Sequence, residues 1–266
     1  MKDASCASPA PKKSLGQHFL RRPDICRRIA DLLDLEEGDQ VLEIGPGPGA
    51  LTDVLQALPH KRLLLLEKDS HWAGFHAGKN TPGTEVRCMD ALAFPWEELE
   101  GKWKLAGNLP YNVASPMLWD IASRCRSLSQ AAFMVQKEVG QRLAAAPGTK
   151  DYGALSVWTQ AFWVPRMAFI VGPSAFTPPP KVDSAVLSFK PLPAEKLPQA
   201  PEALAKVIKL CFSQRRKQLG GVFRKNDRED LLDKLSQLGL PLTVRAEELS
   251  VEQFIFLSVA GKETQG

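Results

Sequence analysis

The stretch that decides the fold reads Val41-Leu42-Glu43-Ile44-Gly45-Pro46-Gly47-Pro48-Gly49. It predicts a short apolar strand over Gln40–Ile44, a turn rich in glycine and proline, and then an apolar helix over Leu51–Leu58. Glycine lets the backbone adopt positive φ angles and come close to a ligand. The spacing here is G-x-G-x-G, whereas a dinucleotide-binding turn has G-x-G-x-x-G and holds a pyrophosphate at the helix N-terminus. The stiff, compressed loop therefore favours a ligand without phosphates.

Acidic residues follow the next two predicted strands. The apolar run Leu63–Leu66 ends at Glu67, and the strand Thr84–Met89 ends at Asp90. Glu67 lies about twenty residues after the glycines, where a carboxylate accepts hydrogen bonds from both ribose hydroxyls. Asp90 is expected to accept one from an adenine amino group. Because these strands end at the sheet edge where ligands bind, the residues predict a site for S-adenosylmethionine. Its predicted contacts are Gly45, Gly47, Glu67 and Asp90.

The sequence then continues to alternate between strands and helices. Two more buried strands are expected over Trp103–Ala106 and Ala131–Val135, each followed by a helix, over Pro116–Ala122 and Lys137–Ala146. Such alternation predicts an α/β fold with a Rossmann-like, doubly wound parallel sheet. Two late strands, expected as an antiparallel pair, are predicted over Ala168–Val171 and Ser184–Phe189.

The last part of the sequence has a different character. Prolines 191, 193, 198 and 201 suggest a linker, and helices are predicted over Ala203–Phe212, Asp230–Leu238 and Val251–Val259. We therefore expect a disordered tail over residues 1–13, a cofactor-binding catalytic domain over residues 14–192 and a small all-α RNA-binding domain over residues 193–266.

The composition excludes several classes of protein. The chain has 266 residues and five cysteines without a Cys-x-x-Cys pair, and it has no His-Glu-x-x-His, so neither disulfides nor a metal are expected. No run of eighteen apolar residues and no apolar signal segment are present, so we expect neither a membrane span nor secretion. These features fit a protein of the reducing cytoplasm.

Asn108-Leu109-Pro110-Tyr111 follows the fourth predicted strand and is predicted to be the catalytic motif. An exocyclic adenine amine is a poor nucleophile, because its lone pair is delocalised into the ring. The Asn108 side-chain oxygen and the Leu109 carbonyl can accept its two N–H groups and direct the lone pair at a sulfonium methyl group. Pro110 fixes the turn, and Tyr111 offers a ring on which the base can stack.

Positive charge is concentrated near both ends of the chain. Residues 1–30 contain seven Lys or Arg against two acids, and residues 206–228 contain eight against one, although the net charge is only +4. This distribution fits either a solvated surface or a polyanion held by an otherwise acidic protein. Clustering in the second segment favours contact with RNA phosphates. The predicted RNA-binding residues are Arg215, Arg216, Lys217, Arg224 and Lys225.

Together these motifs resemble the KsgA family of ribosomal RNA adenine dimethyltransferases. The resemblance rests on residues 14–20, 43–49, 107–111, 176–184 and 212–217. It implies a methyltransferase that transfers four methyl groups to two adjacent adenosines near the 3′ end of small-subunit (16S) rRNA. The expected partner is a small ribosomal subunit assembly intermediate, and the chain is expected to be a monomer. The implied cofactor contacts are His18, Leu20, Gly45, Glu67, Asp90 and Asn108.

The resemblance also bears on Phe176 and His18. The resemblance implies that Phe176 packs on the target base opposite Tyr111, whereas without it a core aromatic beside a proline turn is the favoured interpretation. His18 stands where asparagine is commoner in the family, and an imidazole can still donate to the cofactor carboxylate.

Three alternatives remain. The first is the related large-subunit rRNA methyltransferase that confers antibiotic resistance, which the segments 176–184 and 212–217 disfavour. The second is an assembly factor that binds rRNA without methylating it, which an intact Asn108 motif and Glu67 disfavour. A dehydrogenase is the weakest, because the glycine spacing does not match.

Overall fold

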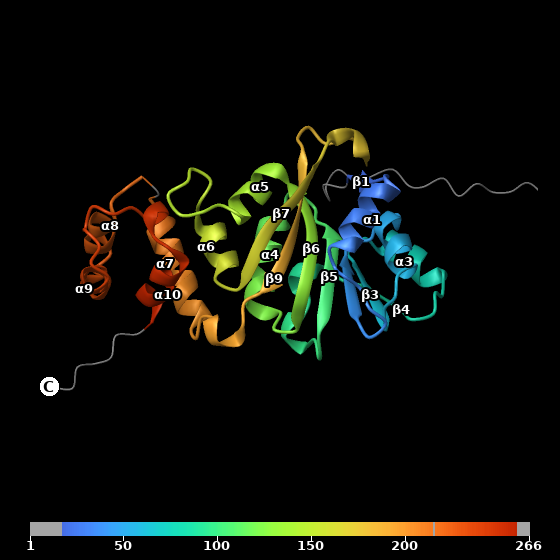
Figure 1. The fold of residues 1–266 in the computed structure, drawn as a ribbon, viewed down its shortest axis with the longest axis horizontal. Helices are drawn as coiled ribbons and strands as arrows, with labels where there is room; N and C mark the ends of the chain where they lie inside the picture. Colours follow the sequence, from blue (N-terminus) through green and yellow to red (C-terminus); the bar gives the residue numbers. More distant parts are fainter. Residues whose placement is uncertain (1–17, 215, 260–266) are drawn as a thin grey trace, which may run out of the picture. The chain divides into compact units, whose positions relative to one another are not determined.

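The computed structural model describes residues 18–214 and 216–259 (Figure 1). The predicted tail, the first residues of the N-terminal motif and Arg215 lie outside these ranges. Contacts divide the chain into two compact units. The first unit contains residues 18–120, Arg124–Gly140 and Met167–Phe189. The second consists of Ile121–Ser123, Gln141–Arg166 and the described residues from Lys190 onward.

A seven-stranded sheet, most of which belongs to the first unit, has the order β4-β3-β2-β5-β6-β9-β7 (Figure 1). Strands β4, β3, β2, β5 and β6 are mutually parallel, and β9 is antiparallel to β6. This arrangement confirms the predicted Rossmann-like class. The strands are β2 (Gln40–Ile44), β3 (Arg62–Glu67), β4 (Thr84–Cys88), β5 (Trp103–Asn108), β6 (Leu128–Gln136), β7 (Trp163–Val171) and β9 (Ser184–Pro191).

The central strands are apolar because both faces of the sheet are covered. The four leucines of β3, Leu63 to Leu66, are each at most 1% exposed. Pro23 begins the first helix, where its missing N–H costs nothing. The helices of this region are α1 (Pro23–Asp31), α2 (Ala50–Gln56), α3 (Ser70–Gly78), α4 (Ala114–Arg124) and α5 (Lys137–Leu143).

The order of the strands also fixes where a ligand binds. From β2 the chain passes to β3 on one side, and β5 then returns to pair with β2 on the other side. In open α/β sheets, such a reversal creates a crevice at the carboxyl ends of the strands. The loop after β2, Glu67 and Asn108 all lie at this edge.

A second, two-stranded sheet joins distant parts of the sequence. Strand β1 (Phe19–Leu20) pairs antiparallel with β8 (Phe176–Thr177), so that Leu20 faces Phe176 in the register. The backbone N–H of Arg21 continues this pairing by donating to Ala175 at 3.0 Å. The N-terminal motif and the proline-rich segment therefore lie side by side.

The second unit is helical. Its helices are α6 (Ala154–Gln160), α7 (Pro201–Phe212), α8 (Leu219–Lys225), α9 (Glu229–Gln237) and α10 (Val251–Ser258). The sequence predicted α7, α9 and α10 but neither α6 nor α8. Helix α6 contacts α7 and α10, which is why residues 141–166 cluster with the C-terminal helices. No helix of the described residues is long and apolar enough to cross a membrane.

Candidate active site

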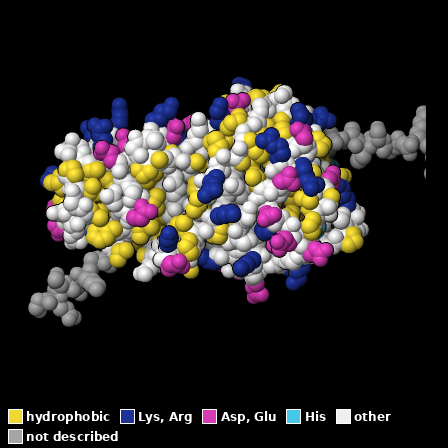
Figure 2. Space-filling model, in the orientation of Figure 1, with side chains coloured by type: hydrophobic (Ala, Val, Ile, Leu, Met, Phe, Trp, Pro, Cys, Tyr) yellow, Lys and Arg dark blue, Asp and Glu magenta, His cyan; other side chains and the backbone are white. Residues whose placement is uncertain are grey.

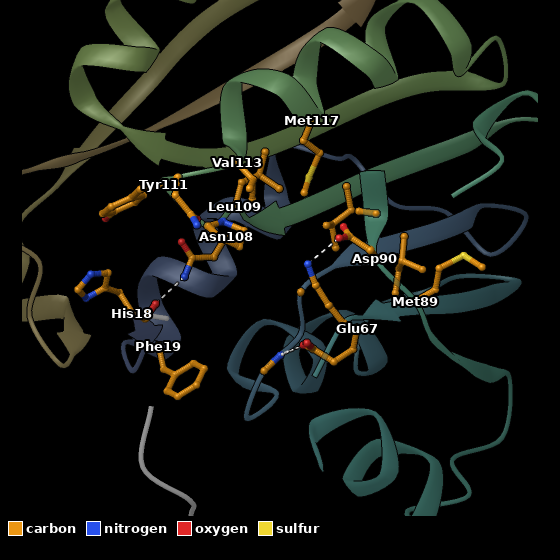
Figure 3. A pocket seen from close by; sticks show the side chains of 18 residues that line it. His18, Phe19, Glu67, Met89, Asp90, Asn108, Leu109, Tyr111, Val113 and Met117 are labelled. Carbon is orange, nitrogen blue, oxygen red and sulfur yellow. Dashed lines mark hydrogen bonds and ion pairs between the residues drawn. The ribbon is translucent and has the colours of Figure 1, made fainter. Parts of the chain in front are cut away.

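A cavity lies at the carboxyl ends of β2, β3, β4 and β5 (Figure 3). Most of the residues predicted from the sequence meet here. The lining includes His18, Gly45, Gly47, Glu67, Asp90, Asn108, Leu109, Pro110 and Tyr111. It also includes residues that the sequence did not single out, among them Phe19, Lys68, Met89, Val113 and Met117.

The glycine loop and Glu67 hold each other in place. Glu67 is 6% exposed; its Oε2 accepts from the Gly47 N–H at 3.0 Å, and its Oε1 accepts from the Asp69 N–H at 2.8 Å. Burial raises the pKa of Glu67 more than these hydrogen bonds lower it. Gly47 has a φ of 51°, which favours glycine, and a Cβ there would lie 3.0 Å from the Phe19 ring.

Asp90 lines the same cavity, and both of its carboxylate oxygens have partners. Oδ1 accepts from the Leu92 N–H at 3.0 Å, and Oδ2 pairs with the Lys68 ammonium at 2.7 Å. Burial raises the pKa of Asp90, but the bonds from Lys68 and Leu92 outweigh it, so the pKa lies below the usual value. Lys68 therefore contacts the carboxylate predicted to recognise adenine.

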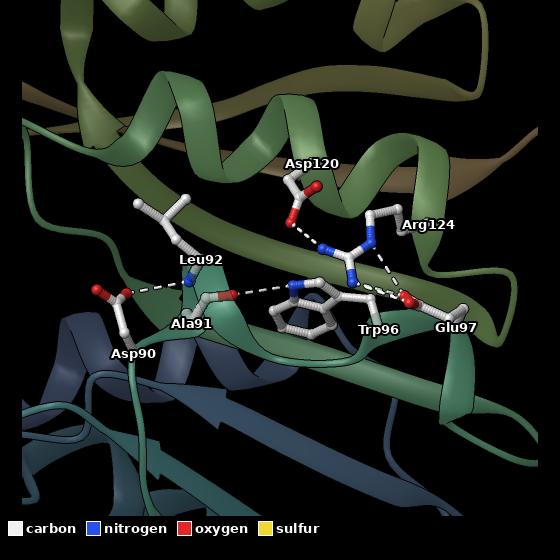
Figure 4. A network of polar contacts seen from close by, with 7 residues as sticks. All are labelled: Asp90, Ala91, Leu92, Trp96, Glu97, Asp120 and Arg124. Carbon is white, nitrogen blue, oxygen red and sulfur yellow. Dashed lines mark hydrogen bonds and ion pairs between the residues drawn. The ribbon is translucent and has the colours of Figure 1, made fainter. Parts of the chain in front are cut away.

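The wall beyond Asp90 is held by a polar network (Figure 4). The buried indole of Trp96 donates to the Ala91 carbonyl at 3.0 Å, and Ala91 lines the cavity. Farther along, the Arg124 guanidinium bridges Glu97 and Asp120, each at 2.8 Å. The segment after β4 is thereby attached to helix α4.

The position of Asn108 sets its chemistry. Its Nδ2 donates to the backbone carbonyl of His18 at 2.9 Å. A carbonyl oxygen only accepts, so this bond fixes the orientation of the amide and leaves Oδ1 as the acceptor. The next residue, Leu109, is tied to strand β6 because its N–H donates to Met134 at 3.0 Å. Two carbonyl-type acceptors, Asn108 Oδ1 and the Leu109 backbone oxygen, thus belong to one rigid turn.

Tyr111 is held by its hydroxyl and by its ring. The hydroxyl lies 2.6 Å from Ser184 Oγ, and burial raises the pKa of the phenol. The ring stacks with the His18 imidazole at a centroid distance of 5.5 Å and an angle of 27°. His18 Nδ1 donates to the Pro178 carbonyl at 2.8 Å. The His18 ring thus lies against Tyr111, the residue on which a base was predicted to stack.

Phe176 and Leu20 have a different environment from the other predicted residues. They are 4% and 7% exposed, belong to the apolar core with Ile25, and do not line the cavity. A contact between Phe176 and a target base would require the ring to leave this core, so the predicted base clamp stays a prediction.

The predicted RNA-binding residues that the structure describes are exposed on the helical unit. Arg216 and Lys217 precede α8, and Arg224 and Lys225 form its last turn. Figure 2 shows Lys and Arg side chains gathered along the upper edge over these helices. Within the described ranges, no three His, Cys, Asp or Glu side chains group as metal ligands would.

Comparison with known proteins now identifies the family. Residues 10–260 match the ribosomal RNA adenine dimethylase family. The chain belongs to this family. A relative from Nitratidesulfovibrio vulgaris, named ribosomal RNA small subunit methyltransferase A, is 52% identical, covering 95% of this chain and 97% of the relative. One of the same name from Lawsonia intracellularis is 48% identical, covering 93% of each chain.

Solved structures agree with this membership. A dimethyladenosine transferase from Plasmodium falciparum has a TM-score of 0.79 at 26% identity, covering 90% of this chain and 96% of that one. The 23S rRNA methyltransferase ErmE, at 24% identity and a TM-score of 0.65, shares the fold, covering 90% of this chain and 98% of that one.

Membership confirms the resemblance to the KsgA family. The chain is an rRNA adenine dimethyltransferase with a Rossmann-like fold, and its methyl donor is S-adenosylmethionine. The dehydrogenase alternative is wrong. The roles of the individual cavity residues stay predictions.

Proposed function

We propose that this rRNA adenine dimethylase methylates N6 of two adjacent adenosines near the 3′ end of small-subunit rRNA, on a partly assembled subunit. The observation that carries the proposal is the fixed amide of Asn108, whose Oδ1 is an acceptor in the wall of the cavity. The names of the small-subunit relatives, at 48% and 52% identity, support the choice of RNA.

We assign the methyl donor to the loop and strand ends around Gly45, Gly47, Glu67 and Asp90. The chemistry of these groups fits a nucleoside: a carboxylate at the end of β3 for ribose hydroxyls and another beyond β4 for an adenine amine. His18 lines the cavity just before β1, and Leu20 lies in β1 next to the lining residue Phe19. We assign both residues contacts with the methionine part, which for the buried Leu20 requires a rearrangement of β1. Lys68 must share Asp90 with the adenine, because its ammonium lies 2.7 Å from Oδ2.

The catalytic turn acts by positioning rather than by strong acid or base chemistry. Asn108 Oδ1 and the Leu109 carbonyl accept the two N–H groups of the target amine, which favours a pyramidal nitrogen. They would aim its lone pair at the methyl group that bound S-adenosylmethionine would supply, with a neutral thioether as the leaving group. The methylated nitrogen then loses a proton to solvent. Pro110 keeps the turn rigid, and a second cycle gives the dimethyl product.

We assign recognition of the flipped base to Tyr111 and Phe176. Tyr111 needs its His18 partner to move before a base can take that ring face, and Phe176 needs to leave the core. Both movements would couple the arrival of RNA to a rearrangement of the paired strands β1 and β8.

We propose that residues 14–192 form the catalytic domain and residues 193–266 an RNA-binding domain, preceded by a tail over residues 1–13. Arg215, Arg216, Lys217, Arg224 and Lys225 would contact phosphates and supply affinity rather than base identity. We also propose that the enzyme acts as a monomer in the cytoplasm.

Replacing Asn108 with alanine tests the mechanism. We expect Asn108→Ala to abolish methyl transfer while RNA binding and the melting temperature stay near those of the unchanged protein. Turnover that is unaffected would refute the mechanism. A protein that never methylates RNA, before or after the change, would favour the alternative of a non-catalytic assembly factor.

The basic segment has its own test. We expect Arg216→Ala with Lys217→Ala to weaken binding of the rRNA fragment and to reduce the slope of log affinity against log salt by about 2, one for each lost phosphate contact. Lys102→Ala, an exposed change in the catalytic unit, is the control and should leave the slope unchanged. An unaltered slope in the double variant would exclude these residues from RNA contact.

A further inference from the structure

Helix α3 places a histidine against the glycine loop. His76 is 3% exposed, and its Nε2 lies 2.8 Å from the backbone oxygen of Gly47. Since a carbonyl oxygen only accepts, Nε2 carries the hydrogen and donates it. No feature of the sequence predicted this contact, because it depends on how α3 packs.

The contact completes the anchoring of Gly47. Its N–H donates to Glu67 Oε2 at 3.0 Å, and its C=O accepts from His76. Side chains from β3 and from α3 therefore hold the two polar groups of one glycine that lines the cavity. Because its N–H and its C=O are both hydrogen-bonded within the protein, Gly47 can contact a ligand only through its Cα, and the two hydrogen bonds hold that atom in place.

His76 also packs against the end of the loop. A Cβ added at Gly49 would lie 2.9 Å from His76 Cε1, closer than such atoms approach in real structures. Gly49 has a φ of 103° and is the N-cap of helix α2. The imidazole thus touches the loop at two of its three glycines, through a hydrogen bond at one and by packing at the other.

This arrangement leaves a buried polar atom unsatisfied. His76 Nδ1 is buried and has no hydrogen-bond partner among the described residues. Burial lowers the pKa of His76 more than the bond to Gly47 raises it, which favours a neutral ring. A buried polar atom without a partner destabilises a fold, and an apolar side chain here would avoid that cost. The histidine is therefore poorly explained by stability alone.

We propose that His76 is a positioning residue for the S-adenosylmethionine loop. Its Nε2–H sets the orientation of the Gly47 peptide, and so it controls affinity for the methyl donor without contacting RNA or the reacting atoms. This inference rests on the assignment of the loop as the cofactor site.

Three variants of the full chain test the inference. His76→Leu removes the donor and fills the space with carbon, His76→Gln keeps an N–H at a similar reach, and His71→Leu is a matched control. His71 lies on the same helix, but its side chain is exposed. Calorimetry with S-adenosylmethionine gives the Kd, and steady-state methylation of the rRNA fragment gives kcat and the KM of each substrate. Thermal unfolding gives stability.

We expect His76→Leu to raise the Kd and the KM for S-adenosylmethionine about tenfold, the loss of ~1.4 kcal/mol of binding. The variant should keep its kcat and its KM for RNA. Its melting temperature should stay unchanged or rise. His76→Gln should bind within about threefold of the unchanged protein, as expected when one hydrogen-bond donor replaces another. His71→Leu should match the unchanged protein.

Equal S-adenosylmethionine affinity in His76→Leu would overturn the inference, and so would a fall in kcat without a change in KM. If His76→Leu does not fold, His76→Gln decides: a folded glutamine variant that binds ten times more weakly contradicts the inference. A Glu67→Ala variant distinguishes an error in the role of His76 from an error in the assignment of the cofactor site. If Glu67→Ala binds S-adenosylmethionine normally, the assignment of the cofactor site is wrong.

Discussion

Glu43 is a buried acid one residue from the end of β2, and its ionisation should govern how stability depends on pH. It is 2% exposed, and its Oε2 accepts from the Thr52 hydroxyl at 2.7 Å. Burial raises the pKa of Glu43 to about 8 from a usual 4.5, and the negative charges of Glu67 and Asp53 add to this. Glu43 is therefore protonated in the folded protein at neutral pH.

The sign and size of the effect follow from this shift. Because the folded-state pKa is raised, the folded protein binds the proton more tightly than the unfolded chain. The stability from this proton is fully present below pH 4.5 and is lost as the pH rises to about 8. At about 1.36 kcal/mol for each pH unit, the whole loss is about 5 kcal/mol at most.

Glu43→Gln replaces the titratable carboxyl group with an amide that does not titrate, while it keeps an acceptor for the Thr52 hydroxyl. Urea unfolding followed by tryptophan fluorescence, at pH values from 5 to 9, gives the free energy of unfolding of each protein. We expect the free energy of unfolding of the glutamine variant to rise, relative to that of the unchanged protein, by about 1 kcal/mol for each pH unit up to about pH 8. Glu37→Gln, at an exposed position, is the control. Parallel curves for Glu43→Gln and the unchanged protein would refute the buried proton.

Three further changes test other parts of the site. Gly49→Ala, at a φ of 103° and with no room for a Cβ, should lower the free energy of unfolding by more than about 1 kcal/mol. Tyr111→Phe leaves the buried Ser184 hydroxyl without its 2.6 Å partner; urea unfolding should show a loss of about 1 to 3 kcal/mol, with kcat largely kept because the ring remains. Trp96→Phe removes the donor to Ala91, so calorimetry should show weaker S-adenosylmethionine binding with an unchanged Kd for RNA. Unfolding curves or Kd values that do not move would contradict the corresponding contact.

The sheet and most of the cavity could be predicted from the sequence because their signals are local. Apolar runs identify strands buried on both faces, and parallel strands bring their carboxyl ends to one edge. The sequence therefore predicted that Gly45, Glu67 and Asp90 lie at one edge of the sheet, and this prediction needed no information on side-chain packing. The boundaries of β2 were predicted to the residue, because the turn at Gly38-Asp39 precedes the strand and the glycine- and proline-rich turn from Gly45 follows it.

Contacts between distant elements could not be predicted in this way. The bond between His76 and Gly47 depends on the rotation of α3, and the pair between Lys68 and Asp90 on the side-chain conformation of an exposed lysine. Phe176 shows a different limit. Its motif suggested a base contact, while pairing of β8 with β1 buries the ring in the core. Helix α6 lacked a strong amphipathic pattern, since four of its seven residues are buried.

The central claim is that this chain dimethylates adenosine in small-subunit rRNA through the Asn108 turn. Mass spectrometry of rRNA from a strain without its own dimethyltransferase tests it directly, with the strain carrying either the unchanged chain or Asn108→Ala. We predict that the unchanged chain restores N6,N6-dimethyladenosine in two adjacent nucleotides of the 3′ fragment of small-subunit rRNA, and that Asn108→Ala restores none. Dimethyladenosine found in large-subunit rRNA instead, or found equally with both proteins, would contradict the account.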